Sequence, residues 1–275
     1  MSAFVSGLDF ITSVLDEIQA NLDNKEVVLR GVKSISDSVV NMKNINSFMR
    51  MSINRCIDYT KASNGMVLVP HMETVNFREM LQLPLNCMKN LQNDKVVIEL
   101  LPTSSEIASF VITDPQWFQE NVLCLLSNAV KYSAEGVIML SVSLVSELTA
   151  NSHPYATSTN PNDEHLMIRV DVEDNGIGVS DEVKAHLFNP FKQAQRLAGG
   201  TGLGLYSLAK RMEAMGGRYG VENRYNGKPG SIFWFAVPYR PDYSQTMPTT
   251  TASGTAALDQ ANAVSDTPEI GRAHV

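Results

Sequence analysis

The 275-residue chain has 44% hydrophobic residues, 19% charged residues and a formal net charge of −7 at neutral pH. These values indicate a globular protein long enough to bury a core and carry an accessory element. The acidic balance, without a basic stripe, argues against nucleic-acid binding. No apolar run approaches the ~20 residues that span a bilayer, and three scattered cysteines favour a reducing compartment. We expect a cytoplasmic location, or the cytoplasmic side of a membrane-anchored parent.

Residues 1–64 carry two apolar stripes with the alternating three- and four-residue spacing of coiled-coil helices. The stripe residues are Phe4, Leu8, Ile11, Leu15, Ile18 and Leu22, then Val32, Ile35, Val39, Met42, Asn46, Met49, Ile53 and Cys56. The polar segment 21–26 between them predicts the turn of an antiparallel helical hairpin. Because two narrow stripes cannot bury each other, we expect a homodimer through residues 1–64, paired as a four-helix bundle. Docking of the hairpin onto the rest of the chain is the alternative.

The next predicted amphipathic helix has Asp114 as its N-cap and contains Asn128, Lys131 and Tyr132 near its end. These three side chains project near one another because they are three and four residues apart. They offer an amide oxygen for Mg²⁺, a cation for phosphate and an aromatic ring for a base. Taken singly, each is more typical of a solvated helix end.

A strand with one buried face is predicted over residues 166–173, where apolar and other residues alternate. It ends at Asp174, which is followed closely by Gly176 and Gly178. This carboxylate can accept a hydrogen bond from the exocyclic amine of a flat ligand in the gap that the glycines leave beside the backbone. A hairpin turn is the alternative, because Asp-Asn-Gly is common turn chemistry.

A glycine-rich run precedes the last predicted helix and reads Gly199, Gly200, Thr201, Gly202, Leu203, Gly204, Leu205. Glycines at this density let backbone N–H groups approach a ligand closely, and amides at a helix start form an anion site with the helix dipole. A phosphate is the natural occupant. For such a run on its own, a flexible loop or a helix cap is the alternative.

In this order, the three segments resemble the ATP-binding domain of sensor histidine kinases, within the superfamily of gyrase-type topoisomerases, mismatch-repair ATPases and a heat-shock chaperone. The resemblance covers about residues 75–238. Asn128 matches the Mg²⁺-holding asparagine of the N box, and Asp174 matches the adenine-recognising aspartate. Residues 187–191 resemble the Phe-containing segment before the lid, which would span about residues 189–200. The second glycine box is matched by Gly200, Gly202 and Gly204.

The resemblance implies a pocket for ATP with Mg²⁺, and Asn128 is its implied metal ligand. The implied binding residues are Asn128, Lys131, Tyr132, Asp174, Gly176, Gly178, Arg196, Gly200, Thr201, Gly202, Leu203 and Gly204. Adenine would contact Asp174 and Tyr132, while Mg²⁺ would bridge Asn128 and phosphate oxygens. The glycine-box amides, with Lys131 and Arg196, would neutralise phosphate charge.

One position departs from the family pattern. Histidine kinases usually have Asn or Glu four residues before the Mg²⁺ asparagine, where it assists the attacking group, but this chain has Cys124 there. Glu120 lies one turn further back, about 12 Å from Asn128 along the helix axis at a rise of 1.5 Å per residue. No catalytic residue is therefore assigned, and a weak or inactive kinase remains an alternative.

The predicted hairpin resembles the dimerisation and phosphoacceptor domain of histidine kinases, with residues 50–65 similar to the end of its second helix. The first helix of that domain carries His-Glu-x-x-x-Pro, but this chain has no histidine before His71. Because residues 1–8 resemble the stretch that follows this box, we hypothesise that the chain starts just downstream of its phosphoacceptor. A complete upstream helix without histidine would instead indicate a degenerate kinase.

The other periodic segments complete the expected fold class, which is α+β. Further strands are predicted over residues 95–100, 107–112, 137–144 and 230–238, and helices over residues 77–93 and 203–215. We expect a two-layer α/β sandwich of the Bergerat type, with a mixed sheet and helices on one face, preceded by an antiparallel helical hairpin. The expected domains are a dimerisation hairpin (1–66), an ATP-binding catalytic domain (75–239) and a disordered linker with an artefactual end (240–275).

The expected function is that of the ATP-binding catalytic portion of a sensor histidine kinase in a two-component phosphorelay. It would transfer the γ-phosphate of ATP to a histidine that this chain lacks, with a response-regulator receiver domain as partner, so the fragment alone should not autophosphorylate. The alternative is a nucleotide-binding dimerisation scaffold or a degenerate kinase without transfer activity. A hydrolytic ATPase of the topoisomerase or mismatch-repair type would have Glu in place of Cys124, a longer lid and a second α/β domain.

Overall fold

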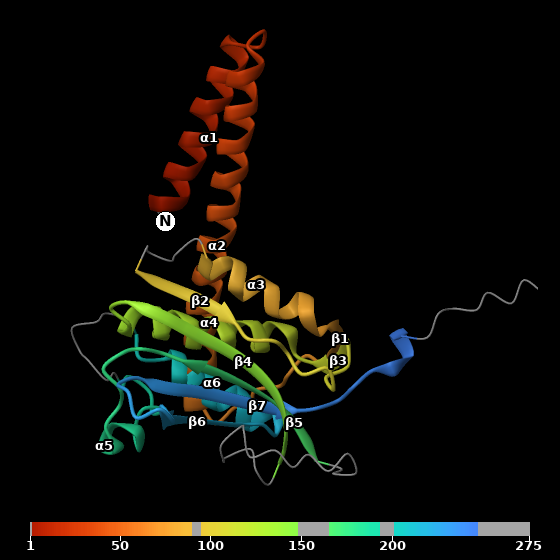
Figure 1. Cartoon of the computed structure of the whole chain (residues 1–275), viewed down its shortest axis with the longest axis vertical. Helices are drawn as coiled ribbons and strands as arrows, with labels where there is room; N and C mark the ends of the chain where they lie inside the picture. The colour runs from red at the N-terminus through yellow and green to blue at the C-terminus, as the bar shows by residue number, and fades with distance from the viewer. Residues whose placement is uncertain (1, 90–94, 148–164, 193–200, 247–275) are drawn as a thin grey trace, which may run out of the picture.

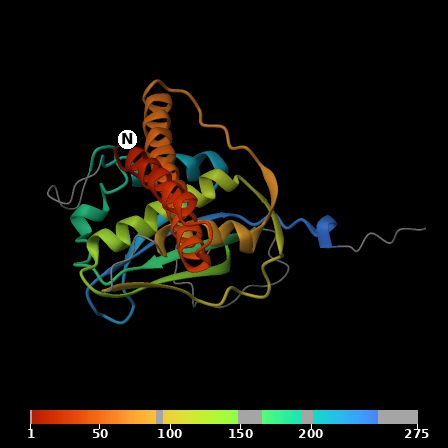
Figure 2. The same ribbon diagram turned by 90° about the horizontal axis from the view of Figure 1, so that it is seen from above.

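The computed structural model describes residues 2–89, 95–147, 165–192 and 201–246. A helical hairpin projects from an α/β body, as the sequence predicts (Figure 1). The hairpin consists of α1 (Ser2–Ala20) and α2 (Lys25–Ser63). Asn24 caps α2, because its side chain accepts hydrogen bonds from the backbone N–H groups of Glu26 and Val27. Figure 2 shows the hairpin from above, with the connection after α2 running round the outside of the body.

The two hairpin helices are antiparallel and closely packed. Gly7 lies beside Met42, and a Cβ on Gly31 would be only 2.6 Å from the Ile18 side chain. Much of the predicted apolar stripe nevertheless faces solvent in the single chain. The exposed members of that stripe include Leu8, Leu15, Leu22, Val32, Val39 and Ile53. The homodimer stays a prediction, and this uncovered surface is where a second copy would bind.

The body is built on a five-stranded mixed sheet with the order β2-β4-β5-β7-β6. Only the β2–β4 pair is parallel. The strands are β2 (Val96–Leu100), β4 (Gly136–Ser146), β5 (Leu166–Glu173), β6 (Arg218–Asn223) and β7 (Ser231–Pro238). A second, two-stranded antiparallel sheet pairs β1 (Glu73–Asn76) with β3 (Phe110–Thr113).

Helices cover one face of the five-stranded sheet, which confirms the expected two-layer α+β fold (Figure 1). They are α3 (Phe77–Lys89), α4 (Pro115–Tyr132) and α6 (Gly204–Met215), while the short α5 (Asp181–Lys184) follows the pocket-forming end of β5. Phe118 of α4 and Met212 of α6 are fully buried against inward-facing strand residues such as Val170 and Phe235. Burial of this apolar layer is the main term that holds the body together.

Two strands escaped prediction. In β6, Gly220 stands where a side chain would collide with the Trp234 indole on β7, since its Cβ would lie 2.6 Å from Trp234 Cζ2. The core-facing residues of β6 are only Tyr219 and Val221, on either side of Gly220, and this alternation is too short to predict a strand. The four-residue β1 is too short for a pattern. The predicted strand over residues 107–112 begins later, at Phe110.

The boundary at residue 240 also differs from the expectation. The Arg240 carbonyl accepts a hydrogen bond from the Ile112 N–H (2.8 Å), and the Asp242 N–H donates to the Phe110 carbonyl (2.9 Å). The predicted linker from residue 240 is therefore wrong for its first residues, because the second edge of β3 pairs with them. The last residues of the predicted helix over 77–93 lie outside the described part of the chain. Within the described part, no helix combines the length and apolarity needed to cross a bilayer.

Candidate functional site

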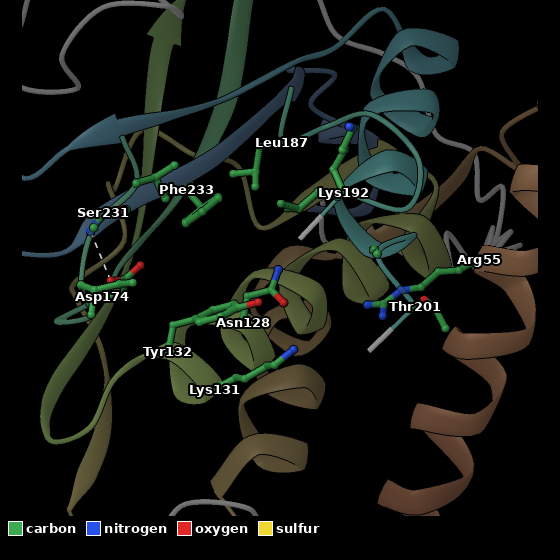
Figure 3. Close-up of a pocket in the computed structure, with 16 residues that line it drawn as sticks. Arg55, Asn128, Lys131, Tyr132, Asp174, Leu187, Lys192, Thr201, Ser231 and Phe233 are labelled. Atoms are coloured by element: carbon green, nitrogen blue, oxygen red, sulfur yellow. Dashed lines mark hydrogen bonds between the residues drawn. The ribbon is translucent and has the colours of Figure 1, made fainter. Parts of the chain in front are cut away.

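A pocket with a cavity volume of about 120 Å³, partly open to solvent, lies where α4, the end of β5 and the start of α6 meet (Figure 3). The structure brings together eight of the twelve predicted binding residues in its lining, namely Asn128, Lys131, Tyr132, Asp174, Gly178, Thr201, Gly202 and Gly204. Gly176 and Leu203 are buried beside the pocket and are not part of its lining. Arg196 and Gly200 lie outside the described residues.

The last turns of α4 supply one wall. The helix begins as predicted, because the Asp114 carboxylate accepts a hydrogen bond from the Trp117 N–H (2.8 Å). Asn128, Lys131 and Tyr132 all reach the pocket from its other end (Figure 3). The Lys131 ammonium lies 5.1 Å from the centroid of the Tyr132 ring. An amide, a cation and an aromatic face are thus presented side by side.

Asp174 forms the opposite wall and is only 4% exposed. Its Oδ1 accepts hydrogen bonds from the Gly176 N–H (2.8 Å) and the Ser231 N–H (3.2 Å). Burial raises the pKa of Asp174, while these two hydrogen bonds and nearby Arg224 oppose that rise. A carboxylate fixed in this way at a pocket wall can accept a hydrogen bond from an amine of a planar ligand.

Gly176 shapes the pocket from behind. A Cβ at this position would lie 2.8 Å from the Tyr132 carbonyl oxygen and 2.9 Å from Asp174 Oδ1. Any side chain would displace the end of α4 or the carboxylate, so only glycine lets the two walls approach this closely. The structure thus gives Gly176 a spacing role, and its predicted contact with the ligand stays a prediction.

The glycine-rich segment ends where α6 begins. Gly202 has a φ of +69°, a conformation that favours glycine, and its carbonyl accepts a hydrogen bond from the Phe191 N–H (3.1 Å). Leu203 is the N-cap of α6, and no side chain caps the helix there. The first N–H groups of α6 are therefore available to an anion at the pocket, where the positive end of the helix dipole also points.

Sequence reasoning missed several lining residues. Ile177, Val179, Leu187 and Phe233 are not among the predicted binding residues, although they lie in or beside the motifs, and they give the pocket an apolar surface suited to a flat base. A further lining residue, Arg55, comes from the hairpin helix α2. No local pattern could have found Arg55, because only the docking of α2 on the body brings it to the pocket.

Cys124 stands where histidine kinases usually have Asn or Glu, and Glu120 lies one helical turn before it. Cys124 is buried, with its Sγ 4.0 Å from the Asn128 Nδ2. Glu120 forms an ion pair with Arg211 (2.7 Å) and accepts a hydrogen bond from Asn54 Nδ2 (2.6 Å). Glu120 is held by these partners on α6 and α2, so it does not replace the side chain missing at Cys124.

The protein side chains at the pocket offer too few ligands for Mg²⁺ unless phosphate oxygens supply the others. Among the described residues, no three or more His, Cys, Asp or Glu side chains gather closely enough to hold a metal. Asn128 lines the pocket and offers a single amide oxygen. Mg²⁺ commonly takes one or two protein ligands and completes its shell with phosphate oxygens and water. The site therefore suits a metal that arrives with a nucleotide.

The sequence of the α/β body matches a known family of ATPase domains. The family described as histidine kinase-, DNA gyrase B-, and HSP90-like ATPase matches residues 113–241. This stretch, just under half of the chain, is similar to that family. The structure of full-length ShkA in complex with AMPPNP has the same fold, with a TM-score of 0.51 at 20% identity, over 88% of this chain and 46% of ShkA.

The curated relatives are sensor histidine kinases and related two-component proteins. The sensor protein GacS of Pseudomonas syringae pv. syringae is 30% identical over 191 residues, which are 67% of this chain and 19% of GacS. Two-component system protein A of Emericella nidulans is 28% identical over 245 residues, which are 83% of this chain and 33% of that protein. The chain thus spans about a fifth to a third of the length of these relatives.

Proposed function

We propose that the chain is the ATP-binding catalytic portion of a sensor histidine kinase in a two-component phosphorelay, transferring the γ-phosphate of ATP to a histidine that is not in this chain. The observation that carries the proposal is the convergence of Asn128, Asp174 and the start of α6 on one pocket. The family match over residues 113–241 supports the same conclusion. The phosphorelay partner would be a response-regulator receiver domain.

Different pocket residues bind the base, the phosphates and the metal of the nucleotide. Asp174 accepts a hydrogen bond from the adenine amine, and the Tyr132 and Phe233 rings with Ile177 enclose the base. The uncapped N–H groups of α6 and Lys131 hold the phosphates. Asn128 would hold Mg²⁺, which when bound neutralises phosphate charge.

Phosphoryl transfer needs positioning and charge stabilisation more than covalent participation by the protein. The structure offers one geometric support for delivery of an acceptor. The N-terminal end of α1 points toward the body (Figure 1), so a histidine-bearing helix presented at that end would approach the body. Such a histidine is the proposed acceptor.

The hairpin supports a homodimer as part of this proposal. Its exposed apolar stripe is interrupted by few charges, and a four-helix bundle with a second copy would bury it. A symmetric pairing of this kind presents two bodies to two acceptor helices.

ATP binding is tested by calorimetry on the full chain with Mg²⁺ and ATP. The Asn128→Ala and Asp174→Ala variants should each lose most of the affinity. Asn41→Ala and Asp16→Ala, which change exposed hairpin residues of the same types, should retain it. Heat of binding that is absent for the unaltered chain, or unchanged in both pocket variants, contradicts the proposal.

Transfer is tested in a chain extended upstream by a histidine-bearing helix and incubated with γ-labelled ATP. Acid-labile, base-stable labelling of that histidine supports a kinase. Nucleotide binding without any labelling supports the dimerisation scaffold instead. Cys124→Asn in the same extended chain should raise the labelling rate by about 10- to 100-fold with little change in ATP affinity, because it restores a polar group beside Asn128.

A further inference from the structure

The hairpin helix α2 reaches the nucleotide pocket through Arg55 (Figure 3). A Cβ built on Gly204, the first residue of α6, would lie 3.3 Å from Arg55 Cζ and 3.4 Å from its Nη1. The guanidinium group is therefore at the N-terminal end of α6, where the uncapped N–H groups face the pocket. Two independent sources of positive potential meet at this point.

The charge of Arg55 is not neutralised by a neighbouring carboxylate in the described part of the chain. Its side chain is half-buried, and its Nη2 contacts Met51 Sδ at 3.0 Å, a weak acceptor. A guanidinium is planar and carries several N–H donors in a fork that matches the oxygens of a phosphate. Such a group beside a helix N-terminus is well placed for a phosphate ligand.

We propose that Arg55 is a phosphate-binding residue of the nucleotide site, supplied by the hairpin and not by the ATP-binding domain itself. This inference rests on the proposed function, since it concerns the same pocket. It adds a consequence: affinity for the phosphate part of ATP depends on docking of α2, and bound nucleotide in turn favours the docked hairpin.

A buried ion-pair cluster holds α2 in the docked position. Arg211 of α6 is 2% exposed and contacts Asp58 of α2 (2.9 Å) and Glu120 of α4 (2.7 Å). Asp58 lies three residues after Arg55, so the two project from nearby positions on the helix. The cluster joins three helices and fixes the segment of α2 that carries Arg55.

A second contact lies on the other side of the same segment. The Tyr59 ring makes edge contacts with Phe191, with centroids 4.8 Å apart, and with Tyr206 of α6, at 5.8 Å. Phe191 is also the residue whose N–H donates to the Gly202 carbonyl. Helix α2, which carries Arg55, therefore contacts Phe191, which is hydrogen-bonded to the glycine-rich segment, and the first turn of α6.

The test compares ATP and adenosine binding to the full chain by calorimetry, with adenosine measured by competition. Arg55→Ala should weaken ATP binding roughly 10- to 100-fold, the loss expected when charge-assisted hydrogen bonds to phosphate are removed. Adenosine affinity should stay the same, because the base contacts are untouched. Arg55→Lys should fall between the two, and Arg50→Ala, an exposed arginine on the same helix, should bind ATP normally.

A double-mutant cycle separates phosphate contact from general loosening. Tyr59→Leu and Asp58→Asn each weaken docking of α2 without touching the pocket, so each should lower ATP affinity in the parent chain. In the Arg55→Ala background, neither should lower it further. If the Asp58→Asn variant does not fold, the Tyr59→Leu variant alone is used. Tyr59 is only partly buried, so its substitution should disturb folding less.

The failures are distinguishable. If Arg55→Ala binds ATP within twofold of the parent chain while Asn128→Ala loses binding, the inference is contradicted and the proposed function stands. If Arg55→Ala weakens ATP and adenosine equally, Arg55 has a structural role only and the inference is again contradicted. If the parent chain does not bind ATP, the proposed function itself fails.

Discussion

The two halves of α2 face different partners and use different chemistry. The half nearer the hairpin turn contacts α1 and leaves apolar side chains such as Val32 and Val39 exposed. The half nearer Ser63 contacts α6 through the buried Asp58–Arg211 pair and through the contact of the Tyr59 ring with Tyr206. One helix thus combines an apolar surface, which suits pairing with a second copy, with a polar cluster that specifies how the body docks.

The hairpin and the body are thus joined by specific polar contacts in addition to the burial of Met51 in the core. Apolar stripes tolerate sliding, whereas a buried guanidinium between two carboxylates has one good geometry. We therefore expect substitutions in the two halves to affect separate properties: oligomeric state in one, and docking with nucleotide affinity in the other.

Removal of Arg211, the cation of the buried ion-pair cluster, should have the largest effect on stability. Arg211→Met leaves the carboxylates of Asp58 and Glu120 buried without their cation, and the free energy of unfolding should fall by about 3–5 kcal/mol. Urea unfolding monitored by tryptophan fluorescence measures the change. Arg218→Ala, which removes a half-exposed pair with Glu147, is the control and should cost about 1 kcal/mol or less.

The pH dependence of that loss has a definite sign. Burial raises the pKa of Asp58 even with Arg211 present, so the folded state favours the protonated carboxyl. The stability that a raised pKa contributes is present at low pH and is lost as pH rises through the folded value. The Arg211→Met deficit should therefore shrink on acidification from pH 7, and a deficit that grows would contradict this account.

A charge in the exposed half should change association instead. Val32→Asp places a carboxylate in the apolar stripe, and the proposed homodimer should dissociate, as sedimentation velocity would show. ATP affinity measured per chain should stay within about twofold, because Val32 is far from the docking contacts. Loss of nucleotide binding without loss of association would reverse the assignment of the two halves.

The pocket has its own pH response. Burial raises the pKa of Asp174 above the ordinary 3.8, so the carboxylate that accepts from the base becomes protonated at a higher pH than an exposed aspartate. Adenosine affinity should therefore fall as pH is lowered from 7, with loss of the acceptor. Asp174→Asn should bind weakly at every pH, and a parent chain with a flat profile down to pH 4 would contradict the role of Asp174.

The smallest expected effect is at the hairpin turn. Asn24→Ala removes the N-cap of α2, whose side chain accepts from two backbone N–H groups, and should cost about 1 kcal/mol. Thermal unfolding measures it, with Asn41→Ala on the same helix as the control. Nucleotide affinity should not change, since the cap lies at the end of α2 that is distant from Arg55.

The sequence predicts the pocket residues that lie within one element. Asn128, Lys131 and Tyr132 follow from helical spacing, and Asp174 follows from the end of a strand. The structure brings them together, with Gly202 and Gly204, around one pocket. Strong local patterns also predict the mixed sheet, its helices and the hairpin, so most of the fold could be foreseen.

What could not be foreseen depends on contacts between distant segments. Arg55 and Asp58 look like ordinary surface residues of an amphipathic helix until α2 docks on α6. Glu120 has no visible partner in the sequence, because Arg211 is far along the chain. Strand β6 has only Tyr219 and Val221 facing the core, and it is fixed by pairing with β7 later in the chain. In each case the deciding neighbour is a tertiary contact, which no periodicity reports.

The most direct measurement is a crystal structure of the full chain with Mg²⁺ and a non-hydrolysable ATP analogue. We predict that the adenine amine donates to Asp174, that Asn128 coordinates Mg²⁺, and that the phosphates lie at the start of α6 beside Arg55. A nucleotide bound elsewhere, or bound in this pocket without contact to Asp174 and Asn128, would contradict the account.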